Sequence, residues 1–209
     1  MMIFFREKYS GCSDEKLMRD LQQGEIQAFS ELYRRYSKRM LYYFYRMLGK
    51  DQQKAQDFLH DLFLKLLEKP ELYDSTNKFY SWLFSIACNL CKNEYRRLAV
   101  RKQYSNEAQA NELHQYVNEE IRIGNRLDQE TFQKALFAEL DSIEPDQKQL
   151  FLLRFQENFS TREIAQILDC KEGTVRSRLF YLVRKLAENL KEFHPLLHEV
   201  ETNDKNKLY

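Results

Sequence analysis

Residues that bend or end regular structure are scarce in this sequence. The 209 residues include 5 Gly and 3 Pro, which is about 4% of the chain against about 12% in an average protein. A β-sandwich, a barrel or a Rossmann fold needs many turns, and this chain has few of the Gly and Pro residues that form them. The scarcity therefore favours an all-α protein whose helices are joined by short loops.

The composition narrows the class of protein further. Charged residues make up 31% of the chain and hydrophobic residues 43%, which argues against disorder throughout. No apolar run approaches the roughly 18 residues that a membrane span needs. The segment from Met1 to Tyr9 leads into no longer apolar stretch, so we expect no secretory signal. We expect a soluble, cytoplasmic protein.

The formal net charge of +1 conceals a separation of charge along the chain. Tyr104 to Asp146 contains ten acidic and three basic residues, whereas Lys171 to Lys191 contains six basic and two acidic residues. A basic C-terminal segment after an acidic middle is typical of a polyanion-binding site with a separate connector. Charge alone leaves ordinary solvated helix faces open as the alternative.

Amphipathic spacing predicts four helices in the first half of the chain. Asp14 can cap a short first helix, and a longer second helix follows it. Asp51 opens a third helix that stops before Pro70. After a polar loop, a fourth helix begins at about Phe79 and ends in a basic run. The apolar faces of these helices predict one compact helical domain, which we place at residues 14–100.

The helical pattern weakens and then resumes in the second half. Apolar residues are sparse and irregular between residues 101 and 128, so we interpret this segment as a flexible acidic linker. Helical spacing returns at Gln129, and Pro145 suits the first turn of the next helix. We place a second small helical domain at residues 129–193 and a polar tail at residues 194–209.

The segment from residue 160 to residue 190 has the pattern of a helix-turn-helix. Ser160 and Glu163 form a capping box that starts a short helix. A tight turn follows, in which Asp169 stands where Gly often sits and can adopt a positive φ. A longer basic helix then begins at about Thr174. This order predicts a DNA-binding unit, with a helical hairpin that has no DNA role as the alternative.

Two of the four cysteines have a spacing that invites a chemical interpretation. Cys88 and Cys91 form a C-x-x-C, as in a redox pair or half of a zinc site. Both lie inside a helical pattern, no second pair or nearby histidine completes a site, and no strand precedes them. We therefore interpret them as small buried thiols, and expect neither a metal nor a cofactor.

Two parts of the chain, taken together, resemble a known family. Residues 144–179 resemble the promoter-binding C-terminal domain of bacterial sigma factors, with the sequence E-P-D-Q-K-Q-L-F-L-L-R-F-Q-E-N-F-S-T-R-E-I-A-Q-I-L-D-C-K-E-G-T-V-R-S-R-L. Residues 55–67 (A-Q-D-F-L-H-D-L-F-L-K-L-L) and 79–97 (F-Y-S-W-L-F-S-I-A-C-N-L-C-K-N-E-Y-R-R) resemble their N-terminal domain. This order is similar to the extracytoplasmic-function (ECF) group of RNA polymerase sigma factors.

The resemblance implies a transcription initiation factor rather than an enzyme. It implies core RNA polymerase and promoter DNA as partners and no small-molecule substrate. It also implies an anti-sigma factor, which in this family is often membrane-anchored. One side of the third helix would bind the polymerase through acidic groups ringed around exposed apolar atoms: Asp57, His60, Asp61, Phe63 and Lys65.

The resemblance also implies two DNA-binding surfaces. The minus-ten element would contact the loop before the fourth helix and the helix itself, where aromatic faces stack on bases and cations follow the phosphates: Ser75, Thr76, Asn77, Lys78, Phe79, Tyr80, Asn89, Lys92, Asn93, Arg96 and Arg97. Trp82 is expected mainly in the core. The last helix would enter the major groove at the minus-thirty-five element through Lys171, Thr174, Arg176, Ser177 and Arg178.

Other functions account for less of the sequence. A polymerase-independent helix-turn-helix regulator explains residues 160–190 but leaves the pattern of residues 55–97 without a role. A helical adaptor that binds only protein leaves the basic helix without one. In the linker, Glu112, Glu119 and Glu120 either mimic phosphates inside the polymerase or simply keep a tether extended.

Overall fold

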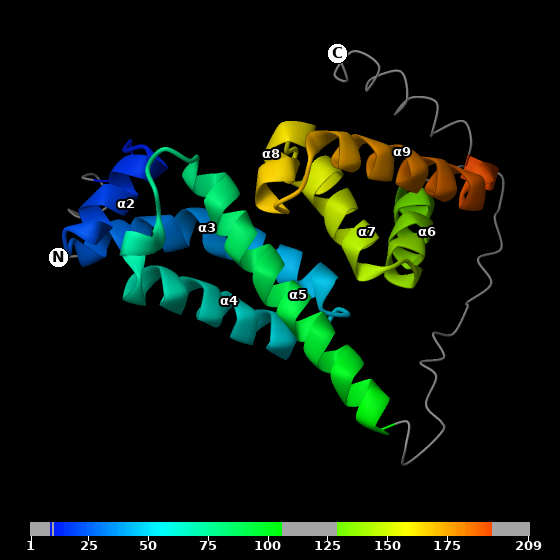
Figure 1. The fold of residues 1–209 in the computed structure, drawn as a ribbon, viewed down its shortest axis with the longest axis horizontal. Helices are drawn as coiled ribbons and strands as arrows, with labels where there is room; N and C mark the ends of the chain where they lie inside the picture. Colours follow the sequence, from blue (N-terminus) through cyan, green and yellow to red (C-terminus); the bar gives the residue numbers. More distant parts are fainter. Residues whose placement is uncertain (1–8, 10, 106–128, 194–209) are drawn as a thin grey trace.

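The computed structural model describes residue 9, residues 11–105 and residues 129–193. The regular elements in these ranges are all helical and form two units, as predicted (Figure 1). The predicted linker beyond residue 105, with Glu112, Glu119 and Glu120, lies outside the described residues, as does the polar tail at 194–209. Among the helices in the described ranges, none is long and apolar enough to cross a membrane.

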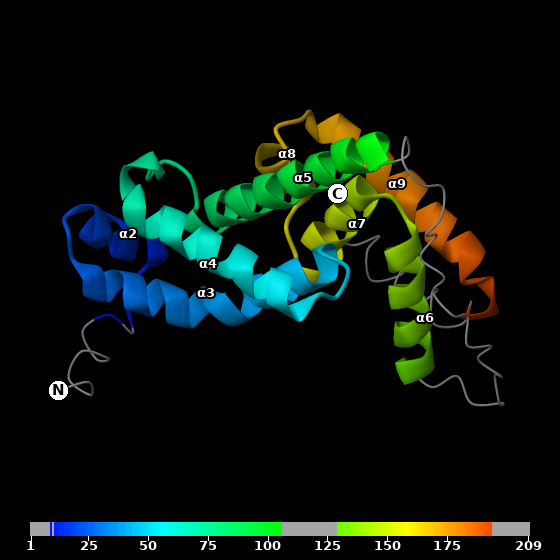
Figure 2. The same ribbon diagram turned by 90° about the horizontal axis from the view of Figure 1, so that it is seen from below.

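The described part of the N-terminal unit contains four α-helices and a short 3-10 turn. In chain order they are α2 (Asp14–Gln22), α3 (Ile26–Met47), α4 (Gln52–Glu68), η1 (Pro70–Leu72) and α5 (Phe79–Ser105). Helices α2 and α4 both pack against α3 (Figure 2), and α5 runs diagonally across α3 and α4 (Figure 1). Because α5 continues to Ser105, the first five residues of the predicted linker are helical.

The ends of these helices follow local rules with one correction. Asp51 caps α4 as predicted, since its side chain accepts a hydrogen bond from the amide of Lys54 at 3.0 Å. The cap of α2 is Ser13 and not Asp14. The Asp14 carboxylate instead accepts a hydrogen bond from Nη1 of Arg35 at 2.7 Å, so tertiary pairing takes the group that could have capped the helix.

The C-terminal unit contains the helix-turn-helix. Its elements are α6 (Gln129–Ser142), α7 (Pro145–Phe151), the π-helical turn η2 (Leu152–Gln156), α8 (Thr161–Ile167), α9 (Glu172–Asn189) and η3 (Lys191–Phe193). Pro145 occupies the first turn of α7, and the capping box of Ser160 and Glu163 at the start of α8 is complete. Asp169 has a φ of 50° in the turn between α8 and α9, as predicted.

The two units share one hydrophobic cluster. Phe159, which is 3% exposed, packs against the rings of both Tyr80 and Phe84 on α5. The ring centroids of Phe159 and Tyr80 are 4.8 Å apart in a stacked arrangement. Aromatic pairs of this kind contribute beyond their buried area. The first turns of α5 therefore lie directly against the C-terminal unit, beside α8 (Figure 1).

Candidate nucleic-acid and protein interfaces

One face of α4 is open to solvent and carries mixed charges. Asp57, His60, Asp61 and Lys65 are all exposed along it, while Leu59 and Leu62 are buried against the rest of the unit. Their spacing of three and four residues places the exposed groups in one stripe. The structure therefore gathers four of the five predicted polymerase-binding residues on one surface, whose partner stays a prediction.

The fifth predicted residue of this surface, Phe63, does not lie on it. Phe63 is 3% exposed, and its ring packs on Tyr33 and Phe29 of α3, with centroids 4.7 and 6.0 Å away. The expectation that Phe63 offers exposed apolar atoms was wrong, because the aromatic residues of α3 draw it into the core. Leu64 takes that position, with 51% of its surface exposed. Leu64 follows His60 by four residues and Asp61 by three, the helical spacing that could have revealed it.

The loop between η1 and α5 presents the predicted base-contacting residues Ser75 to Lys78, which are all exposed. Two hydrogen bonds shape the loop. The hydroxyl of Tyr73 donates to the carbonyl of Asn77 at 2.6 Å, and Oδ1 of Asp74 accepts from the amide of Thr76 at 2.9 Å. The second contact is an Asx-type turn, and it holds the pKa of the Asp74 carboxyl below its usual value.

The two aromatic residues at the start of α5 have different surroundings. Phe79 is fully buried between Tyr36 and Tyr73, so its predicted role as a stacking face for bases is not available in this arrangement. Tyr80 is half-buried, and its hydroxyl donates to Oε2 of Glu157 at 2.7 Å. Burial and this contact raise the pKa of Tyr80. Trp82 is partly buried against the core, as expected.

Farther along α5, a row of polar and cationic side chains faces solvent. Its members recur every three or four residues, and they are Asn89, Lys92, Asn93, Arg96 and Arg97. Nε of Arg97 lies 2.9 Å from the carboxylate of Glu94, which is only 5% exposed and also pairs with Lys54. The row suits a negatively charged strand, and its role in DNA binding stays a prediction.

The first turns of α9 carry the predicted minus-thirty-five residues. Lys171 is the N-cap, and Arg176, Ser177 and Arg178 are exposed, while Val175 is buried. Thr174 is half-buried, and its carbonyl accepts a hydrogen bond from the Ser177 hydroxyl at 3.1 Å. Nη2 of Arg176 lies 2.8 Å from the Glu172 carboxylate one turn earlier. Arg176 and Ser177 thus lie on the outer side of the helix-turn-helix, whereas Arg178 also lines a pocket beside α5.

Two aromatic residues on α9 were missed by the sequence analysis. Phe180 and Tyr181 are 63% and 67% exposed, and their rings meet edge to face with centroids 5.5 Å apart. Large exposed apolar side chains are informative when they gather on one surface. Phe180 lies four residues after Arg176 and Tyr181 four after Ser177, which is the helical spacing that could have placed them beside the predicted DNA contacts.

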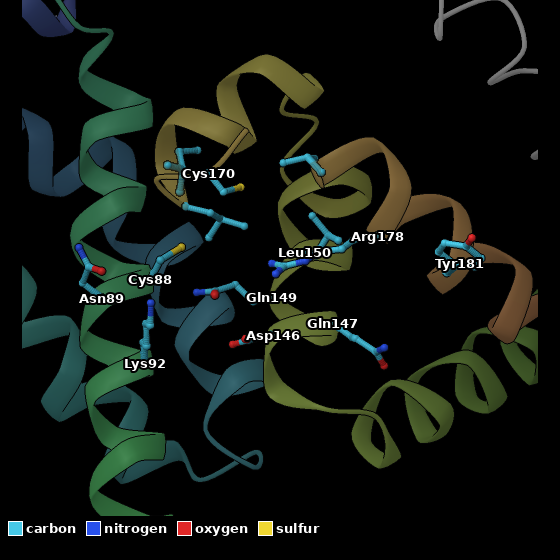
Figure 3. Close-up of a pocket in the computed structure, with 13 residues that line it drawn as sticks. Cys88, Asn89, Lys92, Asp146, Gln147, Gln149, Leu150, Cys170, Arg178 and Tyr181 are labelled. Carbon is cyan, nitrogen blue, oxygen red and sulfur yellow. The ribbon is translucent and has the colours of Figure 1, made fainter. Parts of the chain in front are cut away.

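The structure brings parts of the two predicted DNA surfaces together. A pocket of about 450 Å³ lies between α5 and the C-terminal unit. Figure 3 shows Asn89 and Lys92 on the α5 side of this pocket and Arg178 on the α9 side. A second hollow, of about 560 Å³, is lined by Asn77 and Lys78 of the loop and by Glu163 of α8.

The cysteine pair is buried, as interpreted from the sequence. Cys88 is 3% exposed and Cys91 is fully buried. Burial raises the pKa of Cys88 to about 12 and that of Cys91 well above its ordinary value. Sγ of Cys88 lies 3.2 Å from the hydroxyl of Tyr43, which also accepts a hydrogen bond from Gln149. Within the described ranges, no three His, Cys, Asp or Glu side chains form a potential metal site.

Comparisons with known proteins match each of the two units to a protein family. Sigma-70 region 2 matches residues 32–101, and Sigma-70, region 4 matches residues 133–186. The ECF RNA polymerase sigma-E factor of Haemophilus influenzae is 28% identical over 189 residues, covering 88% of this chain and 97% of its own length. The sigma-E factor of Escherichia coli K12 is 28% identical over 173 residues, covering 80% of this chain and 89% of its own.

Two solved structures share the fold. The sigma factor RpoE of Bartonella quintana, in complex with the anti-sigma factor NepR, matches with a TM-score of 0.58 and 24% identity over 78% of this chain and 96% of its own. CnrH, in complex with the cytosolic domain of CnrY, matches with a TM-score of 0.61 and 20% identity over 87% of this chain and 99% of its own.

Together these matches define a two-domain sigma-70 protein, with region 2 in the N-terminal unit and the region 4 helix-turn-helix in the C-terminal unit. The chain belongs to the ECF group of bacterial RNA polymerase sigma factors, a family of transcription initiation factors and not of enzymes.

Proposed function

We propose that this protein binds core RNA polymerase, recognises the minus-ten and minus-thirty-five elements of a set of promoters, and directs the start of transcription there. The observation that carries the proposal is the presence of three separate surfaces on one chain. They are the exposed face of α4, the loop and outer face of α5, and the first turns of α9.

The α4 face is the surface that we assign to the polymerase. Its exposed charges, Asp57, Asp61 and Lys65, surround the exposed Leu64. A central apolar side chain with a charged rim supports specific helix-on-helix docking, because the rim steers the encounter and the centre supplies buried area. The rest of α4 packs mainly on α3, α5 and η1 of its own unit, which leaves this face exposed.

The two DNA surfaces differ in the chemistry that they offer. The loop from Ser75 to Lys78 supplies hydroxyl, amide and ammonium groups that can hold an unstacked base. The cations of α5, including Lys92 and Arg96, suit the phosphates of an opened strand. In α9, Arg176 and Arg178 have the planar donor geometry that reads guanine in the major groove or binds a phosphate. Sequence preference would therefore reside in the loop and α9, and affinity in α5.

We include an anti-sigma factor among the partners. The structurally similar RpoE and CnrH were both solved in complexes, with NepR and with the cytosolic domain of CnrY. The exposed apolar groups of this chain, such as Leu64 and Phe180, offer area that such a regulator could cover.

Competition for core RNA polymerase tests the proposal. Purified wild-type protein should displace a labelled housekeeping sigma factor from the core enzyme. Leu64→Asp should weaken the displacement about tenfold or more, the loss expected at the centre of an interface. Ile26→Asp is the matched control, because Ile26 is 62% exposed at the start of α3 and lies off the α4 face. Failure of the folded wild-type protein to displace the housekeeping factor would contradict the proposal and favour a polymerase-independent DNA-binding regulator.

A further inference from the structure

We propose that the free protein closes its own minus-ten surface with its C-terminal unit, that the contacts of Glu157 hold this closed form, and that the α4 face stays available to polymerase throughout. The inference rests on the proposed function for its DNA and polymerase surfaces. Its structural part, a closed form held by Glu157, stands independently of that function.

Glu157 makes a buried polar contact between the units, beside others such as that of Lys50 with Asp141 and that of Gln149 with Tyr43. Its side chain is 1% exposed. The carboxylate accepts hydrogen bonds from Nε of Arg39 on α3 and from the hydroxyl of Tyr80 on α5, the latter at 2.7 Å. A buried carboxylate is tolerated only when it is paired, and here both partners from the N-terminal unit are available only while the units are together.

The closed form occupies the residues that would meet the minus-ten element. Tyr80 stacks on Phe159 and is bonded to Glu157, so one face of its ring and its hydroxyl are both engaged. Nζ of Lys78 lies 2.8 Å from the carboxylate of Glu163 on α8. A base cannot stack where Phe159 lies, and a phosphate at Lys78 competes with Glu163.

The approach to the outer face of α5 is restricted as well. Asn89 and Lys92 line the pocket between the units, with Arg178 across from them (Figure 3). The pocket has a volume of about 450 Å³. Asn89 and Lys92 stay exposed, so the closed form restricts the approach to this part of α5 without covering it.

The polymerase face is not involved in closure. Among the described elements, α4 packs mainly on α3, α5 and η1, all from its own unit. Asp57, His60, Asp61 and Leu64 stay exposed in the closed form. The closed form would thus dock on polymerase first. Promoter DNA binds only the open form, so it would shift the docked protein toward that form.

Two substitutions break the same contact from opposite sides. Glu157→Ala removes the acceptor, and Arg39→Ala removes a donor. They change the net charge in opposite directions, so a shared effect on DNA binding cannot come from charge alone. Glu188→Ala is the control, because it removes an exposed carboxylate that pairs only within α9, with Arg184. Far-ultraviolet circular dichroism and thermal unfolding establish that each variant is folded.

Conformation is measured without reference to function. Small-angle X-ray scattering should give a larger radius of gyration for both variants than for the wild type and the control. Alkylation by iodoacetamide, followed by mass spectrometry of the peptide that contains Cys88, should be faster in both variants, because Cys88 lines the pocket between the units. An unchanged radius and an unchanged alkylation rate in both folded variants would show that the contacts of Glu157 do not hold the closed form, and would overturn the proposal.

DNA binding is measured with a fluorescent single-stranded oligonucleotide of mixed sequence. Both variants should bind it about tenfold more tightly than the wild type, since the apparent affinity is lowered by the fraction of molecules that are closed. Affinity for core polymerase should be the same in all four proteins. Opened variants that bind DNA no better, although polymerase binding is intact, would overturn self-inhibition. If the wild type itself fails to bind polymerase, the proposed function is contradicted. The closed form is then tested by the scattering measurement alone.

Discussion

Nε of Arg39 on α3 donates a hydrogen bond to Oε2 of Glu157, a residue 118 positions later in the chain. The same oxygen accepts the hydroxyl of Tyr80, a residue predicted to meet the minus-ten element. The carboxylate of Glu157 therefore holds the C-terminal unit in place and at the same time engages Tyr80, a predicted DNA contact. This relationship links the fold of the free protein to its regulation.

Glu31 should make the stability of the N-terminal unit depend on pH. Its side chain is 7% exposed, and its carboxylate accepts hydrogen bonds from Arg34 and Arg35. The Arg34 contact, with that of Arg35, lowers the pKa of Glu31 from 4.5 to about 2, although burial alone would raise it. Because the folded pKa lies below the unfolded one, this stabilisation is present above about pH 4.5 and is lost as the pH falls toward 2.

Glu31→Gln should therefore lower the free energy of unfolding at pH 7 by about 1–3 kcal/mol. It should also flatten the dependence of that free energy on pH below about 4.5. Urea unfolding followed by circular dichroism at several pH values measures both effects. Glu188→Gln, at a 65% exposed ion pair, is the control and should change little. Equal pH dependence in wild type and Glu31→Gln would show that Glu31 is not the group responsible.

Arg176 should carry part of the recognition of the minus-thirty-five element. Arg176→Ala should cost about 1–3 kcal/mol of binding to a cognate duplex if it reads a base. Arg184→Ala is the matched control, because Arg184 is also exposed and also pairs with a glutamate four residues away, but lies two turns farther along α9. The affinity of promoter duplexes for holoenzyme formed with each variant measures the effect of both substitutions. Unchanged binding after Arg176→Ala would remove Arg176 from the DNA-contacting surface.

Lys92 should contribute affinity without sequence preference. Lys92→Ala should weaken promoter binding to a similar degree for different minus-ten sequences and reduce the slope of log affinity against log salt by about 1. Fluorescence anisotropy of the holoenzyme at several salt concentrations gives the slope. Lys38→Ala, at another exposed lysine on α3, should leave the slope unchanged. A change that depends on base sequence would place Lys92 on a base edge instead.

The four cysteines should react at two different rates. Cys12 and Cys170 are half-buried, whereas Cys88 and Cys91 are buried, with the pKa of Cys88 raised to about 12 by burial. A thiol reacts as its thiolate, so iodoacetamide at pH 8 should modify Cys12 and Cys170 first in the native protein. All four should react in guanidinium chloride. Rapid modification of Cys91 in the folded protein would contradict its burial in the core of the N-terminal unit.

The features that the sequence predicted correctly depend on neighbours in the chain. The capping box of Ser160 and Glu163, the cap at Asp51, Pro145 in the first turn of α7 and the positive φ of Asp169 all follow from contacts within a few residues. The helical periodicity that separates core from surface is equally local. These signals were sufficient for an all-α protein of two units.

The features that the sequence did not predict depend on contacts between distant segments. On α4, helical spacing from Leu59 and Leu66 already favours burial of Phe63, and its packing on Tyr33 and Phe29 excludes it from the exposed face that the family resemblance implied. Phe79 is buried because Tyr36 and Tyr73 surround it. Closure of the units depends on pairs such as Arg39 and Glu157, for which local periodicity carries no signal.

Transcription from purified components tests the central claim most directly. Core RNA polymerase is mixed with this protein and fragments of the genome that encodes it, and the 5′ ends of the transcripts are mapped. The account predicts start sites that differ from those of the housekeeping sigma factor and that share a minus-ten and a minus-thirty-five sequence element. Transcripts no different from those of core enzyme alone, with the folded protein present in excess, would contradict it.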